Sequence, residues 1–127
     1  LDIIISDGPP GIGCPVISSL SGADLAVLVT EPTLSGIHDL ERILGVCHHF
    51  DVPALVCINK YDINIENTEK IEGFCRDEKI EVLARIPFDN IVTEAMIKGL
   101  PVVEYSDGKV SREIQKLWDG VNRRLKI

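Results

Sequence analysis

The sequence predicts an α/β protein with a mostly parallel, doubly wound sheet and flanking helices. Short apolar runs alternate with longer segments whose apolar residues recur at helical spacing. The first three runs are nearly continuous in aliphatic residues, which is typical of strands covered on both faces. Strands joined through amphipathic helices form crossover units, and such units build a parallel sheet.

Four strands are expected, and none of the connections between them looks like a domain linker. They cover residues 1–6, 25–30, 54–59 and 81–86. The chain begins at Leu1 and enters the first strand at once, so we expect it to be a fragment. Residues 1–127 are predicted to form a single domain.

Four helices are expected between and after these strands. They cover residues 36–50 with Ser35 as cap, 66–79, a short segment that ends at Lys98 before Gly99, and 111–125. Asp89 or Asn90 is the predicted cap of the short helix. The last helix should bury one apolar stripe, made of Ile114, Leu117, Trp118, Val121 and Leu125.

Composition excludes several classes of function. The net charge is −7 and the sequence pI is about 4.9, which disfavours a nucleic-acid-binding surface or docking on an anionic membrane. No apolar stretch is long enough to span a membrane. The four cysteines form no C-x-x-C pair, so no zinc or cluster motif is expected. Cys47 and Cys57 lie in apolar stretches and are expected to pack as small hydrophobes, a pattern that suits a reducing cytoplasm.

The loop after the first predicted strand is the most informative one. It begins with Asp7, contains two prolines and continues to Gly11. A carboxylate at the end of a buried strand needs a partner, and magnesium held through water is one candidate. A tight turn, with Asp7 accepting backbone N–H bonds, explains the same residues equally well. Gly11 would allow a close approach of a phosphate oxygen to its backbone N–H.

The loop after the third predicted strand reads N-K-x-D, from Asn59 to Asp62. An Asn amide offers both a donor and an acceptor, a Lys stem covers a ring face, and an Asp accepts from an amino group. This combination suits recognition of a nucleobase. Taken alone, a four-residue pattern of this kind is more often a polar turn.

Four ordered motifs together resemble the MinD/ParA-type P-loop ATPases, whose phosphate-sensing segment is called switch II or deviant Walker B. Residues 7–11 resemble that segment, and residues 29–36, 58–64 and 86–89 follow in the family's order. The resemblance covers essentially the whole chain. It is closest to the subgroup that carries an inserted ferredoxin-like domain with iron–sulfur clusters.

The resemblance implies roles for individual residues. Asp7 would hold magnesium through water, and the loop containing Pro10 and Gly11 would face the terminal phosphate. The base would be bound by Asn59, Lys60, Asp62, Pro87 and Asp89. The implied reaction is in-line attack of water on the γ-phosphate of Mg-ATP. Homodimerisation is a further expectation of the resemblance.

One part of the family pattern is missing from the sequence. No G-x-x-x-x-G-K-[ST] motif or glycine-rich variant with its lysine occurs, so the predicted P-loop NTPase fold is incomplete. The missing strand would lie between the first and second strands predicted here, leaving a gap, a direct closure or an edge covered by another chain. We therefore expect weak nucleotide binding and no catalysis by this chain alone. ATPase activity and 4Fe–4S clusters are expected only in a longer parent.

Two alternatives remain open at this stage. A GTPase also uses N-K-x-D, but it spaces Asp and Gly as D-x-x-G, one residue closer than Asp7 and Gly11. A GTPase would also have a later S-A-K type loop, where this chain has Ile86 and Pro87. The second alternative is a non-enzymatic regulatory domain, which leaves the two prolines after Asp7 unexplained.

Overall fold

The sheet of the protein is parallel, as predicted. The computed structural model describes residues 3–9 and 13–126. Three strands are hydrogen-bonded in the order β1 (Ala26–Thr30), β2 (Ala54–Asn59) and β3 (Val82–Ile86). Both pairings are parallel, with Ala26 opposite Ala54 and Asn59 opposite Ile86. The α/β class and the parallel sheet are therefore confirmed.

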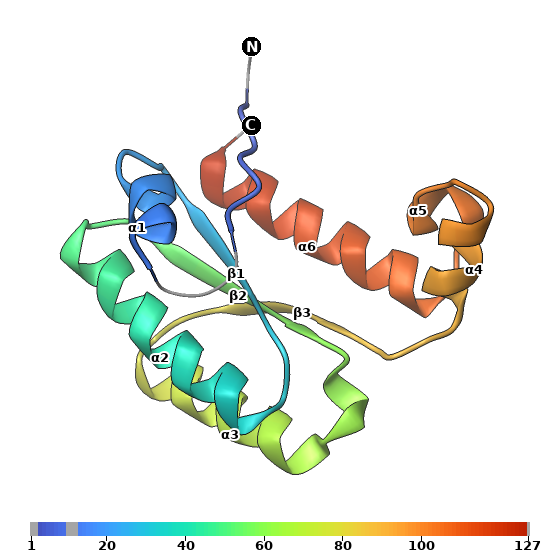
Figure 1. The fold of residues 1–127 in the computed structure, drawn as a ribbon, viewed down its shortest axis with the longest axis horizontal. Coiled ribbons are helices and arrows are strands. Elements are labelled where there is room, and N and C mark those ends of the chain that lie inside the picture. Colours follow the sequence, from blue (N-terminus) through green and yellow to red (C-terminus); the bar gives the residue numbers. More distant parts are fainter. Residues whose placement is uncertain (1–2, 10–12, 127) are drawn as a thin grey trace.

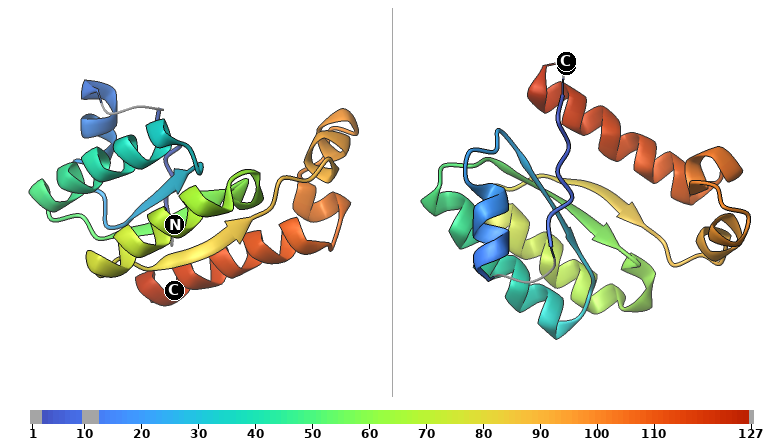
Figure 2. Two further views of the ribbon diagram at one scale, coloured as in Figure 1. Left: turned by 90° about the horizontal axis from the view of Figure 1, so that it is seen from below. Right: turned by 45° about the horizontal axis from the view of Figure 1, so that its top comes forward.

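Helices cover both faces of this sheet (Figures 1 and 2). Helices α1, α2 and α3 lie on one face, α6 lies on the other, and α4 and α5 project beyond the end of β3. The helices and one 3₁₀ turn are α1 (Cys14–Leu20), α2 (Leu34–His49), η1 (Tyr61–Ile63), α3 (Ile65–Asp77), α4 (Ile91–Ile97), α5 (Val102–Tyr105) and α6 (Lys109–Leu125).

The central strand and the helices above it form the main core. Val56 and Ile58 of β2 pack against Leu40 of α2 and Ile71 of α3, and all four side chains are buried. A second cluster joins Val16 and Leu20 of α1 to Cys47 at the end of α2. Thus the first helix, which the sequence reasoning did not predict, is held by apolar contacts.

The first predicted strand is wrong for the residues that the structure describes. Residues 3–9 belong to no helix or strand, and Ile4 and Ile5 are 81% and 74% exposed. A strand is stabilised by the ladder with its neighbour. The described part of the chain supplies no strand beside this segment, and β1 does not close onto it. Of the two arrangements expected within the chain itself, a gap or a direct closure, the gap is the one observed.

The same gap overturns two burial predictions. β1 was expected to be covered on both faces, but Val27 and Val29 are 36% and 64% exposed. The apolar stripe of α6 was expected to be buried, but Trp118 is 39% exposed and the other four residues are only half-buried. Helix α6 packs on β3 at the far edge of the sheet, so its stripe is not covered by β1.

Most helix boundaries lie within two residues of the predicted ones, and two of the differences concern helix starts. Thr33, not Ser35, caps α2, because its side chain accepts a hydrogen bond from the backbone N–H of Gly36 at 2.9 Å. Helix α6 begins at Lys109 rather than Ser111. Ser111 instead lies inside the helix, where its hydroxyl donates to the carbonyl oxygen of Val102 at 3.1 Å.

Three of the four cysteines are buried, among them Cys47 and Cys57, which were expected to pack as small hydrophobes. Burial raises the pKa of Cys57 to about 11, with a smaller contribution from the charge of Glu113. Within the described residues, no helix combines the length and the apolar character that a membrane span requires.

Candidate functional site

The loop after β2 places the N-K-x-D residues at the carboxyl end of the central strand. Asn59 is the last residue of β2 and is half-buried. Lys60 adopts a left-handed backbone conformation, with φ of 55°, that turns the chain directly into η1. The backbone N–H of Ile63 donates to the carbonyl oxygen of Lys60 at 3.1 Å and closes this turn.

Asp62 joins this loop to the loop after β3. Its Oδ1 accepts a hydrogen bond from the backbone N–H of Phe88 at 2.8 Å. Pro87, the first residue after β3, is half-buried, whereas Phe88 is 58% exposed. The structure therefore brings Asn59, Asp62 and Pro87 to one rim, at the carboxyl ends of two neighbouring strands. The resemblance assigned base recognition to these two loops.

The carboxylate of Asp89 makes a hydrogen bond within its own loop. Its Oδ1 accepts from the backbone N–H of Ile91 at 3.0 Å, at the first residue of α4. This bond confirms that the carboxylate helps to start the helix. It leaves the second carboxylate oxygen for the base-binding role that the resemblance implied.

An ion pair connects the loop after β1, through Glu31, to Lys60 of the rim. Lys60 Nζ lies 3.5 Å from Glu31 Oε1, with both side chains partly exposed. The loop is compact because α2 starts immediately after it. A Cβ atom at Gly36 would collide with the carbonyl oxygen of Glu31, so the close turn requires glycine there.

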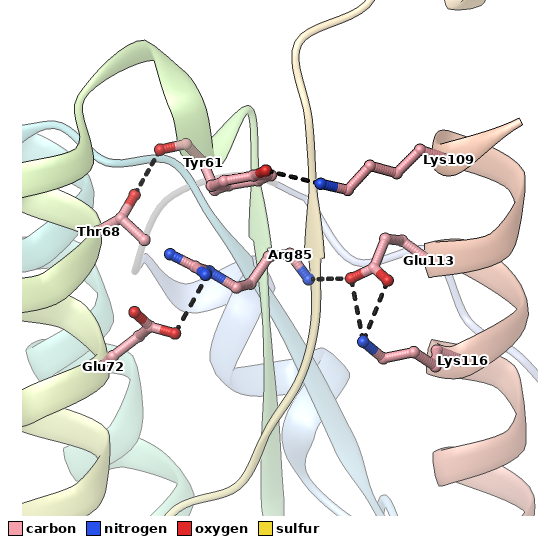
Figure 3. Close-up of polar contacts among 7 residues, drawn as sticks. All are labelled: Tyr61, Thr68, Glu72, Arg85, Lys109, Glu113 and Lys116. Carbon is pink, nitrogen blue, oxygen red and sulfur yellow. Dashed lines mark hydrogen bonds and ion pairs between the residues drawn. The ribbon is translucent and has the colours of Figure 1, made fainter.

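Tyr61, the variable residue of N-K-x-D, connects this loop to α3 and α6 through the contacts drawn in Figure 3. Its carbonyl oxygen accepts from Thr68 Oγ1 at 2.7 Å, and its hydroxyl accepts from Lys109 Nζ at 2.9 Å. The guanidinium carbon of Arg85 lies 4.6 Å from the ring centroid, which is cation–π range. The hydrogen bond to Tyr61 is the main cause of the raised pKa of Lys109.

Arg85 and Glu113 also connect Tyr61 to α6 (Figure 3). The backbone N–H of Arg85 donates to Glu113 Oε1 at 2.9 Å, and Lys116 Nζ lies 3.1 Å from Glu113 Oε2. Burial raises the pKa of the Glu113 carboxyl, but the hydrogen bonds from Arg85 and Lys116 and the charge of Lys116 lower it by more, so the net shift is downward. Arg85 Nε lies 3.4 Å from Glu72 Oε2, yet its N–H is not aligned to donate to any described atom.

The sequence reasoning missed these contacts of Tyr61. Tyr61 stands at the variable position of N-K-x-D, and Lys109 lies 48 residues away. An aromatic residue at that position was the available signal, because a buried Tyr hydroxyl usually finds a polar partner.

Asp7 does not end a strand as predicted. It is exposed and belongs to the irregular segment 3–9 instead of ending a strand. Pro10 and Gly11 lie outside the described residues. Among the described residues, no hydrogen bond or ion pair joins Asp7 to Asn59, and their shared role in one site stays a prediction. Both explanations of Asp7 given above, magnesium or a turn, stay open.

Asp7 lines a large open groove instead. The groove has a volume of about 1590 Å³ and is bounded by residues 3–9, β1 and the apolar stripe of α6. Glu31 lines it as well, and Glu31 also pairs with Lys60 of the rim. The groove and the rim are therefore adjacent.

The described residues hold no preformed metal site. Within the part of the chain that the structure describes, no three His, Cys, Asp or Glu side chains gather as ligands. This arrangement is still compatible with magnesium, which keeps several waters and binds through one or two carboxylates plus substrate phosphates. Asp7 is the residue that would hold it.

The fold belongs to a known class. It is the α/β fold of P-loop NTPases, and the chain superposes on cell-division ATPases of the MinD type. For MinD of Pyrococcus furiosus the TM-score is 0.75 at 24% identity, over 92% of this chain and 50% of that one. For MinD of Aquifex aeolicus it is 0.74 at 25% identity, over 91% and 50%.

Sequence relatives point to the same group, although no family model matches the chain. An uncharacterised protein of Methanocaldococcus jannaschii is 33% identical over 91% of this chain and 38% of its own length. The iron–sulfur cluster carrier protein of Pyrococcus horikoshii is 27% identical over 99% and 47%. MinD of Bacillus subtilis is 30% identical over 80% and 40%.

The chain is thus a relative of the MinD and iron–sulfur cluster carrier proteins, within the MinD/ParA-type ATPases. The predicted resemblance is confirmed. The chain spans about two fifths to one half of the length of these relatives.

Proposed function

We propose that the chain forms the base-binding side of a nucleotide site in a MinD/ParA-type ATPase, where binding and hydrolysis of Mg-ATP act as a switch. The observation that carries this proposal is the rim itself. Asp62 fixes Phe88 at 2.8 Å, so the loops after β2 and β3 form one wall. Ligands of open α/β sheets bind at this end of the strands. MinD of Pyrococcus horikoshii was solved with Mg-ADP, which supports the class of ligand.

We propose individual roles for the residues of the rim and of the loop that begins at Asp7. The amide of Asn59 offers a donor and an acceptor to the adenine edge, and Pro87 offers an apolar surface to the ring. Lys60 and Asp89 flank this pocket. When bound, magnesium supplies positive charge to the transferring phosphoryl group. Asp7 would orient the waters around that ion, and Pro10 and Gly11 would face the terminal phosphate.

Adenine is favoured over guanine by the environment of Asp62. Recognition of guanine through N-K-x-D needs this carboxylate to accept hydrogen bonds from the base. In the structure, one of its oxygens already accepts from the backbone N–H of Phe88. A guanine base would therefore have to compete with the backbone N–H of Phe88 for Asp62, which argues against the GTPase alternative.

The biological setting is proposed by similarity. We place the parent protein in the cytoplasm as a nucleotide-dependent homodimer. Iron–sulfur cluster carriers among the relatives support a parent associated with 4Fe–4S clusters. We expect the chain alone to bind nucleotide weakly and to be catalytically silent, because it lacks a phosphate-binding loop.

The direct test is a two-dimensional NMR titration of the ¹⁵N-labelled chain. We expect millimolar Mg-ATP to shift the backbone signals of Asn59, Lys60 and Phe88, and Mg-GTP to shift them less. Asn59→Ala should abolish the shifts, whereas the control Asn122→Ala, on α6, should not. Unmoved rim signals would contradict the proposal. Calorimetry that gave micromolar affinity for the chain alone would contradict its weak-binding part.

A further inference from the structure

Residues 88–109 leave the body of the fold after β3 and return to it at the start of α6. This stretch, which we call the α4–α5 segment, contains both short helices and projects beyond the end of β3 (Figures 1 and 2). Much of its apolar surface is open to solvent, since Met96 and Ile97 are 72% and 78% exposed. A projecting segment with few buried contacts can change position without disturbing the core.

Both ends of the α4–α5 segment are bonded to neighbouring residues of the N-K-x-D loop. At the first end, the backbone N–H of Phe88 donates to Asp62 Oδ1 at 2.8 Å. At the last end, Lys109 Nζ donates to the hydroxyl of Tyr61 at 2.9 Å (Figure 3). We call these two hydrogen bonds the end contacts. Since Tyr61 and Asp62 are adjacent in η1, one short turn binds the segment both where it leaves the sheet and where it returns.

The turn that makes the end contacts is itself fixed to the body of the fold. The carbonyl oxygen of Tyr61 accepts from Oγ1 of Thr68, a fully buried residue of α3. The guanidinium carbon of Arg85 in β3 lies 4.6 Å from the centroid of the Tyr61 ring. When two contacts close a loop on one fixed element, loss of the first increases the chain entropy that the second must overcome. The end contacts should therefore be cooperative.

The contact of Lys109 reaches the helices of the segment as well as its end. The hydroxyl of Ser111, in the first turn of α6, donates to the carbonyl oxygen of Val102 in α5 at 3.1 Å. Helix α5 is thus fastened to the turn that carries Lys109. The Lys109 side chain is exposed, so its hydrogen bond competes with water and has a modest strength. A contact of that strength can be made or broken, which gives the segment a held and a released form.

We propose that Tyr61 is a positioning residue: through Lys109, and together with Asp62, it holds the α4–α5 segment against the base-binding loop. The cooperativity of the end contacts rests on the geometry of these three side chains and Phe88. A base bound at the rim favours the held form of the segment, and this response rests on the proposed function.

The proposed base contacts lie beside the end contacts in the sequence. Asn59 stands two positions before Tyr61, and Pro87 directly precedes Phe88. A base that touched both Asn59 and Pro87 would be bound on both sides of the hydrogen bond between the two loops. By linkage, a molecule that binds the held form of the segment would in turn strengthen binding of the base.

A double-mutant cycle tests the end contacts in the 127-residue chain without nucleotide. Tyr61→Phe removes the hydroxyl and keeps the ring beside Arg85, whereas Lys109→Met removes the ammonium group. Each change should speed hydrogen exchange at the backbone N–H of Phe88 about threefold, the effect of losing one modest hydrogen bond. The double variant should exceed neither single variant. Exchange at Val56, which is fully buried in β2, should stay unchanged and shows that the fold is kept.

Lys70→Met is the matched control for Lys109→Met. Lys70 is also an exposed lysine in a polar contact, but its partner, Glu66 at 3.7 Å, lies on the same helix, α3. The control should leave exchange at Phe88 unchanged.

Millimolar Mg-ATP tests the response to the base. In the unmodified chain, the NMR signals of Asn59 at the rim and of Val103 in α5 should both shift. In Tyr61→Phe the signal of Asn59 should still shift, whereas that of Val103 should not. A purely structural role of Tyr61 would weaken both responses together.

Three results would overturn the proposal. The first is additive effects of Tyr61→Phe and Lys109→Met on exchange at Phe88. The second is an equal effect of Lys70→Met, and the third is a response of Val103 that persists in Tyr61→Phe. Unmoved signals at Asn59, combined with a non-additive cycle, would reject the proposed function and support the cooperative end contacts, so the two failures are distinguishable.

Discussion

Asp62 links the two loops of the rim through one hydrogen bond. Its carboxylate holds the backbone N–H of Phe88 at 2.8 Å. We expect Asp62→Ala to lower the free energy of unfolding by about 1 kcal/mol, because a hydrogen bond between loops is lost. Asp62→Asn keeps an acceptor oxygen and should lose less. Urea unfolding of both variants measures this, and equal losses would show that the charge matters rather than the bond.

Glu113 makes stability depend on pH. Its folded pKa lies below the usual 4.5, so its contribution is present above that value and is lost as the pH falls through the lower folded pKa. At pH 7 we expect Glu113→Gln to cost about 1 kcal/mol, since the amide keeps one acceptor but loses the charge. The difference from the unmodified protein should shrink toward pH 3.

A surface ion pair provides the control for this experiment. Glu66 lies 3.7 Å from Lys70, and its side chain is 83% exposed. Glu66→Gln should cost less than about 0.5 kcal/mol at any pH, because exposed pairs contribute little. Urea unfolding at pH 7, 5 and 3 compares the two variants. A Glu113→Gln difference that stayed constant over this range would contradict the assigned pKa shift.

Single residues of the site were predictable where the chemistry is carried by neighbours in sequence. Asn59 and Asp62 stand three positions apart at the end of an apolar run, and the structure places them at a strand end as predicted. The contact of Tyr61 with Lys109 spans 48 residues and depends on where α6 packs. No local pattern encodes such a packing angle. The catalytic and binding roles themselves stay predictions.

At the scale of elements, α2 offers a choice between two caps. The sequence favoured Ser35, but the structure uses Thr33, whose side chain accepts from the N–H of Gly36. We expect Thr33→Ala to cost about 1 kcal/mol of stability, as the loss of a cap usually does. Ser35→Ala should be neutral within about 0.5 kcal/mol. Thermal unfolding separates them, and the reverse order would restore the sequence-based cap.

Two helical glycines should respond in opposite ways to alanine. Gly73 in α3 has open space where a Cβ would lie, so Gly73→Ala should stabilise by about 0.5–1 kcal/mol. A Cβ at Gly120 in α6 would come within 2.9 Å of Leu83 Cδ1. Overpacking costs about 1–3 kcal/mol, which exceeds the gain in helix propensity. In guanidinium unfolding, the free energy of unfolding should be higher for Gly73→Ala than for the unmodified protein and lower for Gly120→Ala.

Elements with a strong local pattern were the predictable ones. The residues of β2 and the span of α3 were close to those expected, because each carries its apolar residues on a regular period. Helices α1 and α5 have only seven and four residues, and they were not predicted. Such short helices are stabilised by their packing rather than by their own sequence.

For the whole molecule, protection against hydrogen exchange should decrease from the centre of the sheet to its open edge. Leu55, Val56, Cys57 and Ile58 are at most 1% exposed and should exchange slowest. Among the described strands, the N–H groups of Val27 and Val29 have no partner, so they should exchange fastest. NMR of the chain alone in D₂O measures this gradient. Slow exchange at both valines would mean that the edge is already covered.

Sequence reasoning predicted the class of the whole fold, but it did not predict that the groove between β1 and α6 is open. Apolar period and element order determine a parallel sheet, and the sheet is parallel. Burial is different, because a residue such as Trp118 becomes buried only if something else covers it. The prediction for α6 assumed a complete domain, and the open groove is where that assumption failed.

The four cysteines differ in exposure, and this difference allows one of them to be labelled selectively. Cys47, Cys57 and Cys75 are buried, and burial raises their pKa values, to about 11 for the last two. Maleimide reagents react with accessible thiolates, so these three should stay unmodified in the native state. Cys14 is exposed at the start of α1. One dye could therefore be attached there without mutagenesis, on the element whose Val16 and Leu20 line the groove.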